Sequence, residues 1–416
     1  MVKVLHFSDL HLGVENYGRL DPETGLNSRL VDFLRAFDYV VDYVLEHGVE
    51  LVIFAGDAYK TRRPNPTYQR EFARRIRRLS AQSVPVLLLV GNHDKPNIPE
   101  RASTLGIYAT LGIEHVYVAA IPGTWNIETT SGKVQIVALP WVTRSQLLTR
   151  DEYKNKRIEE INDIMVEKIE HLLADQINKL DPAVPAILTA HSTVQGAAYG
   201  SERSVMLGQD IVLPLSLVAD PAFDYVALGH IHRHQVLRKD PPVVYSGSLE
   251  RIDFGEEKEE KGFVVAEVSR GNTEWRFHST HARRFVTIDV MARDRDPMAC
   301  IHEVIEVSDI RDAIVRLIIH INAEQEPLLR EGQIRQWLSD AFHVAAIARD
   351  VERPVRMRLG TGLSVEEMTP SQLLTHYLQT KKVGAERIKV LTRYASAIFT
   401  GDDELDSNGT KEGDAQ

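Results

Sequence analysis

The first ninety residues alternate short apolar segments with segments of helical periodicity. Residues 2–7, 51–54 and 84–90 are apolar runs of strand length, and the last is unbroken, as in a strand buried on both faces. Between them, residues 30–44 repeat apolar side chains at helical spacing, and residues 71–79 fit a second helix. Strands that alternate with helices predict a parallel sheet, so this pattern indicates an α/β fold.

Further apolar segments predict how the chain is organised. Strands are predicted at 134–139, 186–189, 225–228, 243–245, 263–268 and 275–277, and a long helix at 156–180. Beyond residue 220 the strands follow each other without helices, which favours one domain of stacked mixed sheets flanked by helices, over residues 1–282. A second, smaller α/β pattern occupies residues 283–362.

Two short amphipathic helices are predicted over residues 363–400. Ser364 to Glu367 has capping-box spacing, and Thr369-Pro370 reads as an N-cap followed by proline. Residues 373–378 and 388–398 each place apolar side chains on one face. Such a pair buries little by itself, so it docks either on the rest of this chain or on a partner protein. The acidic segment 401–416 is predicted to be disordered.

Composition indicates the cellular compartment, and the net charge bears on whether the chain binds nucleic acid. The single cysteine, Cys300, excludes an intrachain disulfide, and no apolar run reaches the roughly 18 residues of a membrane helix, so we expect a cytoplasmic protein without membrane contact. The net charge of −10 argues mildly against nucleic acid. However, residues 60–78 contain eight basic residues and one acidic residue, either as a solvated helix face or as a surface for phosphates.

Five short polar clusters follow predicted strands. In open α/β sheets, ligands bind beyond the carboxyl ends of the strands, so all five clusters should meet at one rim. They supply seven candidate metal ligands, which are Asp9, His11, Asp57, Asn92, His191, His230 and His232.

Seven donors are too many for one tetrahedral ion, but they suit two ions that share a carboxylate. Mixed imidazole, carboxylate and amide donors favour Mn²⁺, Fe or Zn²⁺, and of these Mn²⁺ is our prediction. Two ions about 3.5–4 Å apart stabilise the attacking and the leaving oxygen of a phosphoryl displacement. The clusters therefore predict phosphate ester hydrolysis.

The order Asp-x-His, Gly-Asp, Gly-Asn-His-Asp, His and Gly-His-x-His resembles the calcineurin-like metallophosphoesterases. Residues 6–13, 245–251, 253–256 and 261–263 are similar to segments of SbcD-type DNA repair nucleases. This resemblance implies a sandwich of two mixed β-sheets flanked by helices, a small α/β capping domain that assists DNA binding, and a C-terminal helical pair for a partner.

The resemblance also implies roles for single residues. Asp57 would bridge the two ions, with Asp9, His11 and His232 completing one site and Asn92, His191 and His230 the other. His93 would contact the scissile phosphate or protonate the leaving oxygen, and Asp94 would orient His93. Some relatives carry a second histidine where this chain has Lys60. The residues expected to face DNA are Lys60, Arg62 and Arg63, with Ser248 and Arg251 as further candidates.

The implied function is a two-metal DNA nuclease acting in double-strand-break repair and recombination. It would combine 3′–5′ exonuclease activity on double strands with endonuclease activity on single strands and hairpins. The implied partners are DNA, an SMC-like coiled-coil ATPase of the SbcC type, and a second copy of the chain in a homodimer.

Other interpretations stay open. Protein phosphatases of this superfamily carry Asp-Arg-Gly and Gly-Asn-His-Glu, whereas this chain has Ala58-Tyr59-Lys60 and Asp94, which disfavours that class. A phosphodiesterase for small molecules shares the core motifs. A scaffold that has lost catalysis would bind no pair of divalent ions, so metal content separates it from an enzyme.

Overall fold

A computed structural model describes residues 1–96, 101–149, 154, 156–200, 210–293, 295–352 and 369–400. The chain forms two compact units, residues 1–351 and 352–416. The expected tail at 401–416 and the capping-box segment at 364–367 lie outside the described residues.

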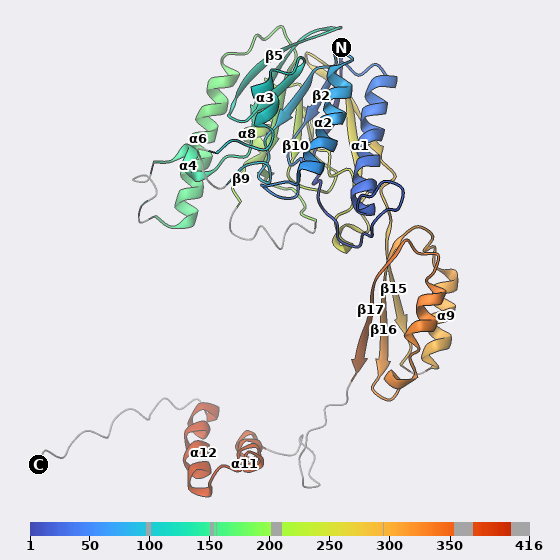
Figure 1. Ribbon diagram of the computed structural model, residues 1–416. Helices are drawn as coiled ribbons and strands as arrows, with labels where there is room; N and C mark the ends of the chain where they lie inside the picture. Colours follow the sequence, from blue (N-terminus) through green and yellow to red (C-terminus); the bar gives the residue numbers. More distant parts are fainter. Residues whose placement is uncertain are drawn as a thin grey trace, which may run out of the picture. The chain divides into compact units, whose positions relative to one another are not determined.

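The first unit contains two six-stranded mixed sheets (Figure 1). In the first sheet, four strands run parallel and the last two in sequence join antiparallel at one edge. Its order is β14 (Asn272–Ser279), β13 (Gly262–Ser269), β1 (Val2–Phe7), β2 (Leu51–Phe54), β3 (Val86–Leu89) and β4 (Val116–Ala119).

The second sheet has four parallel strands between two antiparallel edge strands. A separate pair, β8 (Thr193–Val194) and β9 (Val212–Leu213), lies outside it. The order of the second sheet is β11 (Gln235–Lys239), β12 (Pro242–Tyr245), β10 (Tyr225–Gly229), β7 (Ala186–His191), β6 (Gly132–Leu139) and β5 (Gly123–Thr129).

The two sheets stack face to face through a fully buried apolar layer. Val4 and Ile53 of the first sheet belong to the same cluster as Ile136 and Ile187 of the second, and all four are 0% exposed. Burial of this layer is the main force that holds the sheets together. The stacked mixed sheets confirm the predicted fold class.

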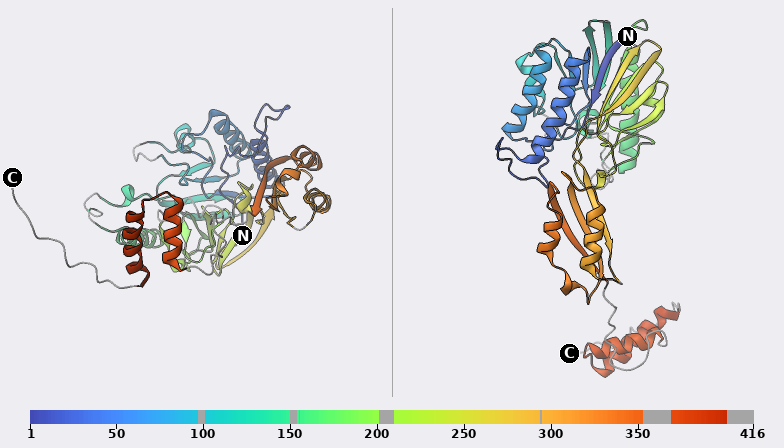
Figure 2. Two further views of the ribbon diagram at one scale, coloured as in Figure 1. Left: turned by 90° about the horizontal axis from the view of Figure 1, so that it is seen from below. Right: turned by 90° about the vertical axis from the view of Figure 1, so that its right-hand side faces the viewer.

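Helices cover the outer face of each sheet, as the right-hand view of Figure 2 shows. The first sheet is covered by α1 (Ser28–Glu46), α2 (Pro66–Ser80) and α3 (Gly106–Leu111). The second is covered by α4 (Arg144–Leu147), α6 (Ile158–Ile177) and α8 (Leu215–Val218). Helix α2 begins as its sequence dictates, because the side chain of Asn65 accepts a hydrogen bond from the N–H of Thr67 and proline occupies the first helical position.

A three-stranded sheet forms a smaller part of the first unit, which we call the capping sheet. Its strands are β15 (Phe285–Met291), β16 (Ile314–Asn322) and β17 (His343–Glu352), and it packs on α9 (Pro297–Val307) and α10 (Glu331–Trp337). A short 3₁₀ turn (Glu326–Leu328) precedes α10, and the extended backbone of Leu329 separates the two. The domain boundaries drawn from the sequence stay predictions.

The second unit contains two helices, α11 (Pro370–Thr380) and α12 (Ala385–Thr400). Thr369 caps α11 as predicted, since its hydroxyl accepts from the N–H of Gln372. The helices contact each other through hydroxyl groups, including Thr375 and Thr392 at 3.3 Å. Tyr377 and Tyr394 are 58% and 61% exposed. The side chain of Ile398 lies outside the described residues.

Candidate metal centre

Five strands from both sheets end at one rim, and the predicted ligands lie there. β1, β2 and β3 lead into the segments of Asp9, Asp57 and Asn92, whereas β7 and β10 end at or just before His191 and His230. Parallel strands of one sheet place their carboxyl ends on one side, and the stacked sheets bring the two sets together. The structure thus gathers all seven candidate ligands, as expected from the order of the motifs.

The loops at this rim hold their residues in a conformation that most side chains avoid. Asp9, His11, Asp57 and His230 have φ angles of +52°, +46°, +62° and +97°. Left-handed backbone costs a non-glycine residue on the order of 1–3 kcal/mol and persists where surrounding contacts impose it. Four candidate ligands share this conformation, so the contacts around them must hold the loops of the rim in place.

One group of donors consists of Asp9, His11 and His232. The Nε2 atoms of the two histidines are 3.0 Å apart. The Nε2 of His11 lies 4.0 Å from Oδ1 of Asp9 and 3.7 Å from Oδ2 of Asp57. One ligand atom from each of Asp9, His11 and His232 lies within 4.8 Å of the others, which suits a single ion.

A second group is built around Asn92. Its Oδ1 lies 2.9 Å from Nε2 of His191 and 3.2 Å from Nδ1 of His230. Oδ2 of Asp57 is 3.5 Å from Nε2 of His191. The same carboxylate oxygen is therefore close to a histidine of each group, which is the place that a bridging ligand requires.

The donor atoms are arranged favourably for divalent cations, because without a cation some of them face each other unfavourably. Nε2 of His11 and Nε2 of His232 face each other at 3.0 Å, so their lone pairs oppose unless a proton or a cation lies between them. The buried Nδ1 of His11 has no hydrogen-bond partner in the described part of the chain. Nitrogen and oxygen donors without thiolates are typical of Mn²⁺, Fe and Zn²⁺ sites.

Electrostatics at the rim reflect two opposing effects. Burial alone would lower the pKa of His191, but the carboxylates of Asp57 and Asp9 raise it to about 9. Burial would raise the pKa of Asp57, but His191, His93 and His11 hold it well below its usual value. Burial raises the pKa of Asp9 against the lowering effect of His191 and His232. An anionic Asp57 between imidazoles is therefore the stable arrangement, and it is suited to cations.

Two motif glycines are required because other groups approach their backbone closely. A Cβ on Gly91 would lie 2.1 Å from Oδ1 of Asp57, and one on Gly56 would lie 2.4 Å from Nδ1 of His191. No side chain fits at these distances. The glycines of the Gly-Asp and Gly-Asn-His-Asp motifs thus make room for the ligands.

His93 lies beside the donors, but Asp94 does not orient it as we expected. Nδ1 of His93 donates to the carbonyl of Lys60 at 2.8 Å. The carboxylate of Asp94 instead accepts from the backbone N–H groups of Asp57, Ala58 and Gly91. These N–H groups are buried and need an acceptor, which explains why Asp94 turns away from the ring. Asp94 therefore fixes the loop that carries Asp57.

The pKa of His93 also differs from the value expected for a histidine that is hydrogen-bonded to a carboxylate. Burial lowers the pKa of His93, although Asp57 opposes this effect. A carboxylate partner on the ring would have raised it. Burial, together with the charge of Asp57, raises the pKa of Asp94 to about 7.

The predicted DNA contacts divide into two sets. Lys60, Arg62 and Arg63 are exposed next to the rim, and Nε of Arg62 donates to the carbonyl of Asn92 at 3.3 Å. Ser248 is 0% exposed and donates to the carbonyl of Glu250. Arg251 donates to the carbonyls at positions 282, 283 and 259. Ser248 and Arg251 are thus structural in this fold, rather than DNA contacts as the sequence suggested.

Most of the basic helix face at 66–78 has a structural explanation. Arg75 and Arg78 of α2 pair with Asp38 of α1, and Arg78 also pairs with Asp42. Arg70 and Arg74 pair with Glu71. For α2, the interpretation as an ion-paired helix surface is the better one.

Among the residues that contact the candidate ligands, sequence reasoning missed Asp210, Glu256 and Trp141. Oδ2 of Asp210 is 3.0 Å from Nε2 of His230, and Oε1 of Glu256 is 2.8 Å from Nδ1 of His232. The ring of Trp141 lies 5.0 Å from that of His230. Glu256 stands in the segment 253–256, whose resemblance to nucleases was the available signal, whereas no pattern singled out Asp210 or Trp141.

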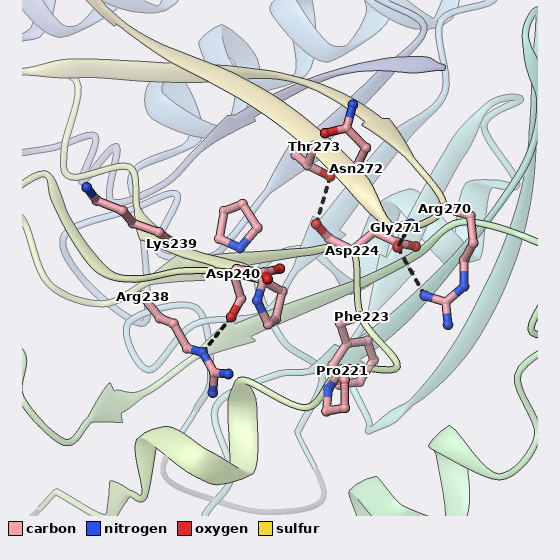
Figure 3. A pocket seen from close by; sticks show the side chains of 12 residues that line it. Pro221, Phe223, Asp224, Arg238, Lys239, Asp240, Arg270, Gly271, Asn272 and Thr273 are labelled. Atoms are coloured by element: carbon pink, nitrogen blue, oxygen red, sulfur yellow. Dashed lines mark hydrogen bonds and ion pairs between the residues drawn. The ribbon is translucent and has the colours of Figure 1, made fainter.

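A cavity of about 600 Å³ lies elsewhere, beside Asp224 at the start of β10 and therefore at the other end of this strand from His230 (Figure 3). Both of its arginines bond to neighbouring groups. Arg270 donates to Asp224 at 3.0 Å, and Arg238 donates to the carbonyl of Asp240. The cavity thus has no part in the rim chemistry.

The calcineurin-like phosphoesterase family model matches residues 2–234, more than half of the chain, and this stretch contains all seven candidate ligands. The chain belongs to this family. Its members bind two divalent metal ions, and the buried histidine and aspartate groups of this chain are of the kind that holds them.

The chain is also similar in sequence to individual curated proteins. The chain is similar to the SbcD component of the nuclease SbcCD from Staphylococcus saprophyticus (27% identical, 64% of this chain and 66% of the relative). It is also similar to the DNA double-strand break repair protein Mre11 of Thermoplasma acidophilum (25%, with 65% and 63% covered) and of Archaeoglobus fulgidus (27%, with 61% and 52% covered). The matches span 66%, 63% and 52% of the relatives' own lengths, which is less than two thirds in each case. Among the described residues, no helix is long and apolar enough to cross a membrane.

Proposed function

We propose that this chain is a two-metal DNA nuclease, the nuclease component of a double-strand-break repair complex. Its activities would be exonucleolytic on double strands and endonucleolytic on single strands and hairpins, with Mn²⁺ as the preferred ion. A second candidate is another metal-dependent phosphodiesterase of the same family, which the shared site chemistry also allows.

One observation carries the proposal. Oδ2 of Asp57 lies 3.7 Å from Nε2 of His11 and 3.5 Å from Nε2 of His191, and these histidines belong to different donor groups. Two adjacent donor groups around one carboxylate are suited to phosphodiester hydrolysis. The names of the similar proteins favour DNA as the substrate.

The candidate ligands would form two metal sites. Asp9, His11 and His232 would hold one ion, Asn92, His191 and His230 the other, with Asp57 between them. The bound ions would polarise the phosphate and lower the pKa of an attacking water.

His93 would act on the substrate itself. With Nδ1 bonded to the carbonyl of Lys60, its Nε2 remains to contact the scissile phosphate or, when protonated, to donate to the leaving oxygen. The positive charges of Lys60, Arg62 and Arg63 would neutralise DNA phosphates.

The direct test is incubation of the purified protein with Mn²⁺ and labelled linear and hairpin DNA, with a cyclic nucleotide and an aryl phosphodiester in parallel. A nuclease cleaves DNA at the higher kcat/KM. If the small diesters are cleaved and DNA is not, the second candidate replaces the first. If metal-depleted protein takes up no divalent ions, both fail.

Replacing Lys60, Arg62 and Arg63 together by alanine is expected to weaken DNA binding about equally for all sequences. Each lost phosphate contact lowers the slope of log K against log salt by about 0.7–0.9, so the triple variant should lose roughly two to three units. Fluorescence anisotropy at several salt concentrations measures this slope. Arg77→Ala is the control, because Arg77 is exposed near the end of α2, far along the helix from the rim. An equal loss in both variants would argue against a phosphate track at residues 60–63.

We also propose that α11 and α12 bind a coiled-coil ATPase of the SMC type. The exposed side chains of Tyr377 and Tyr394 offer apolar surface for such a helix. Removing residues 363–416 should leave Mn²⁺-dependent cleavage of single-stranded DNA within about twofold, while pull-down of the ATPase is lost. Tyr377→Ser with Tyr394→Ser in the full chain should weaken the same pull-down. Undiminished binding by the truncated chain would refute the assignment.

Two further proposals follow from the resemblance. The chain would form a homodimer through its phosphoesterase domains, and it would work in the cytoplasm. Sedimentation of the purified protein tests the first of these directly.

A further inference from the structure

Glu256 is a fully buried carboxylate whose two oxygens are held by different partners. Its Oε1 accepts from Nδ1 of His232 at 2.8 Å. Its Oε2 accepts from the N–H of Ile252 at 2.9 Å and lies 2.9 Å from Nζ of Lys261. The side chains of Glu256 and Lys261 are both 0% exposed. A buried ion pair of this kind is rigid, because leaving either charge unpaired would be costly.

The pair ties the chain around His232 in two places. Nζ of Lys261 donates to the backbone carbonyl of His232 at 3.1 Å, while Glu256 holds the ring of the same residue. Lys261 also pairs with Glu259 at 2.8 Å. Both the main chain and the side chain of His232 are therefore fixed from the side away from the donor group.

The hydrogen bond from Nδ1 also selects the tautomer of His232. With its proton on Nδ1, the ring presents the lone pair of Nε2 toward His11 and the rest of the donor group. The ammonium of Lys261, 2.9 Å from Oε2, provides the opposite charge that a buried carboxylate requires. Histidine ligands whose far nitrogen donates to a carboxylate are better oriented and more basic.

We propose that Glu256 is a positioning residue that fixes the tautomer and orientation of His232, and so sets the ion affinity of the group Asp9, His11 and His232. The inference rests on the proposed function, because it assigns a supporting residue to the same site. It adds a residue that lies outside the seven predicted ligands.

Residues close to Glu256 in sequence contact the capping sheet and not His232, so one of them can serve as a control. Glu257 accepts from the N–H and the hydroxyl of Thr287 on the capping sheet, at 2.8 and 2.6 Å. Phe254 packs on Phe285 with ring centroids 5.0 Å apart. The short turn η1 (Phe254–Glu256) and the residue after it therefore hold His232 on one side and β15 on the other. Glu257→Gln perturbs this turn without touching the histidine.

The experiment is calorimetric titration of metal-depleted full-length protein with Mn²⁺, comparing the natural chain with Glu256→Gln and Glu257→Gln. Glu256→Gln should weaken one of the two sites about 10–100-fold and leave the other within about twofold. Glu257→Gln should leave both sites unchanged. Electron paramagnetic resonance at two equivalents of Mn²⁺ should show a coupled ion pair in the natural chain and uncoupled Mn²⁺ in Glu256→Gln.

Lys261 keeps Glu259 as a partner in Glu256→Gln, which favours folding of this variant. Should it not fold, Glu256→Gln with Lys261→Met removes both buried charges, and the same loss at one site is expected. Natural affinity at both sites in whichever variant folds would overturn the inference, and so would an equal loss in Glu257→Gln. If the natural chain itself binds no ion pair, the proposed function fails first. If it binds two and Glu256→Gln binds them equally, only this inference fails.

Discussion

Asp57→Asn is expected to lower phosphodiester cleavage by about 10³-fold or more, because the amide would remove the negative charge that the two ions share in the proposed site. The carboxylate is 2% exposed and surrounded by His11, His93 and His191, so solvent cannot replace the lost charge. Single-turnover cleavage of labelled DNA measures the effect, and titration with Mn²⁺ should show that at least one ion is bound more weakly.

Asp224→Asn is the matched control for this variant. Asp224 is also a buried aspartate, but it lies just before β10, at the other end of the sheet, and pairs with Arg270. Its replacement should reduce thermal stability and leave the turnover of folded protein nearly unchanged. Near-normal cleavage by folded Asp57→Asn would contradict the bridging role.

His93→Ala is expected to retain two ions and to lose about 10²–10⁴-fold in turnover, the usual range for a missing proton donor or phosphate contact. The alternative is that His93 is itself a ligand, since His11, Asp57 and His93 also place ligand atoms within 4.8 Å of one another. Metal content of the purified variant decides between these roles, and a stoichiometry that falls to one ion would favour the ligand.

His234→Ala supplies the comparison. This histidine follows His232 closely, but its Nδ1 donates to the carbonyl of Tyr245 and its ring stacks on Phe277 with centroids 4.1 Å apart. It should affect stability more than turnover. If His234→Ala lost as much turnover as His93→Ala at unchanged metal content, general disturbance of the rim would explain both.

The sequence predicted those strands and helices in which apolar residues follow a regular pattern. Strands β1, β2 and β3 and helix α1 carry unbroken or periodic apolar residues, and their positions followed directly. Strands β4, β5 and β11 were not predicted, because they are partly exposed and their burial patterns match neither alternation nor a continuous run. The pairing of β13 with β1 joins residues more than 250 positions apart, and no local pattern specifies it.

The candidate site was predictable where chemistry depends on residue type and strand ends, and less so where it depends on local turns. The seven ligand candidates came together because each follows a strand of the same rim. Asp94 was misjudged because adjacency in sequence suggested a contact with His93, whereas the backbone N–H groups of the neighbouring loop needed its carboxylate. Glu256 accepts a hydrogen bond from His232, which is 24 positions away in sequence, and only the folded chain brings the two residues together.

The donors come from both halves of the sandwich, and this has a consequence for folding. Neither sheet alone carries a complete set, since Asp57 and Asn92 follow strands of one sheet and His191 and His230 follow strands of the other. A chain in which only one sheet has formed therefore has no high-affinity place for an ion. If the seven residues hold the ions as proposed, divalent ions would favour the fully assembled state, and at a free concentration 100 times Kd each would add about 2.7 kcal/mol to its stability. Chelators should consequently make unfolding easier throughout this unit, far beyond the loops that touch the ions.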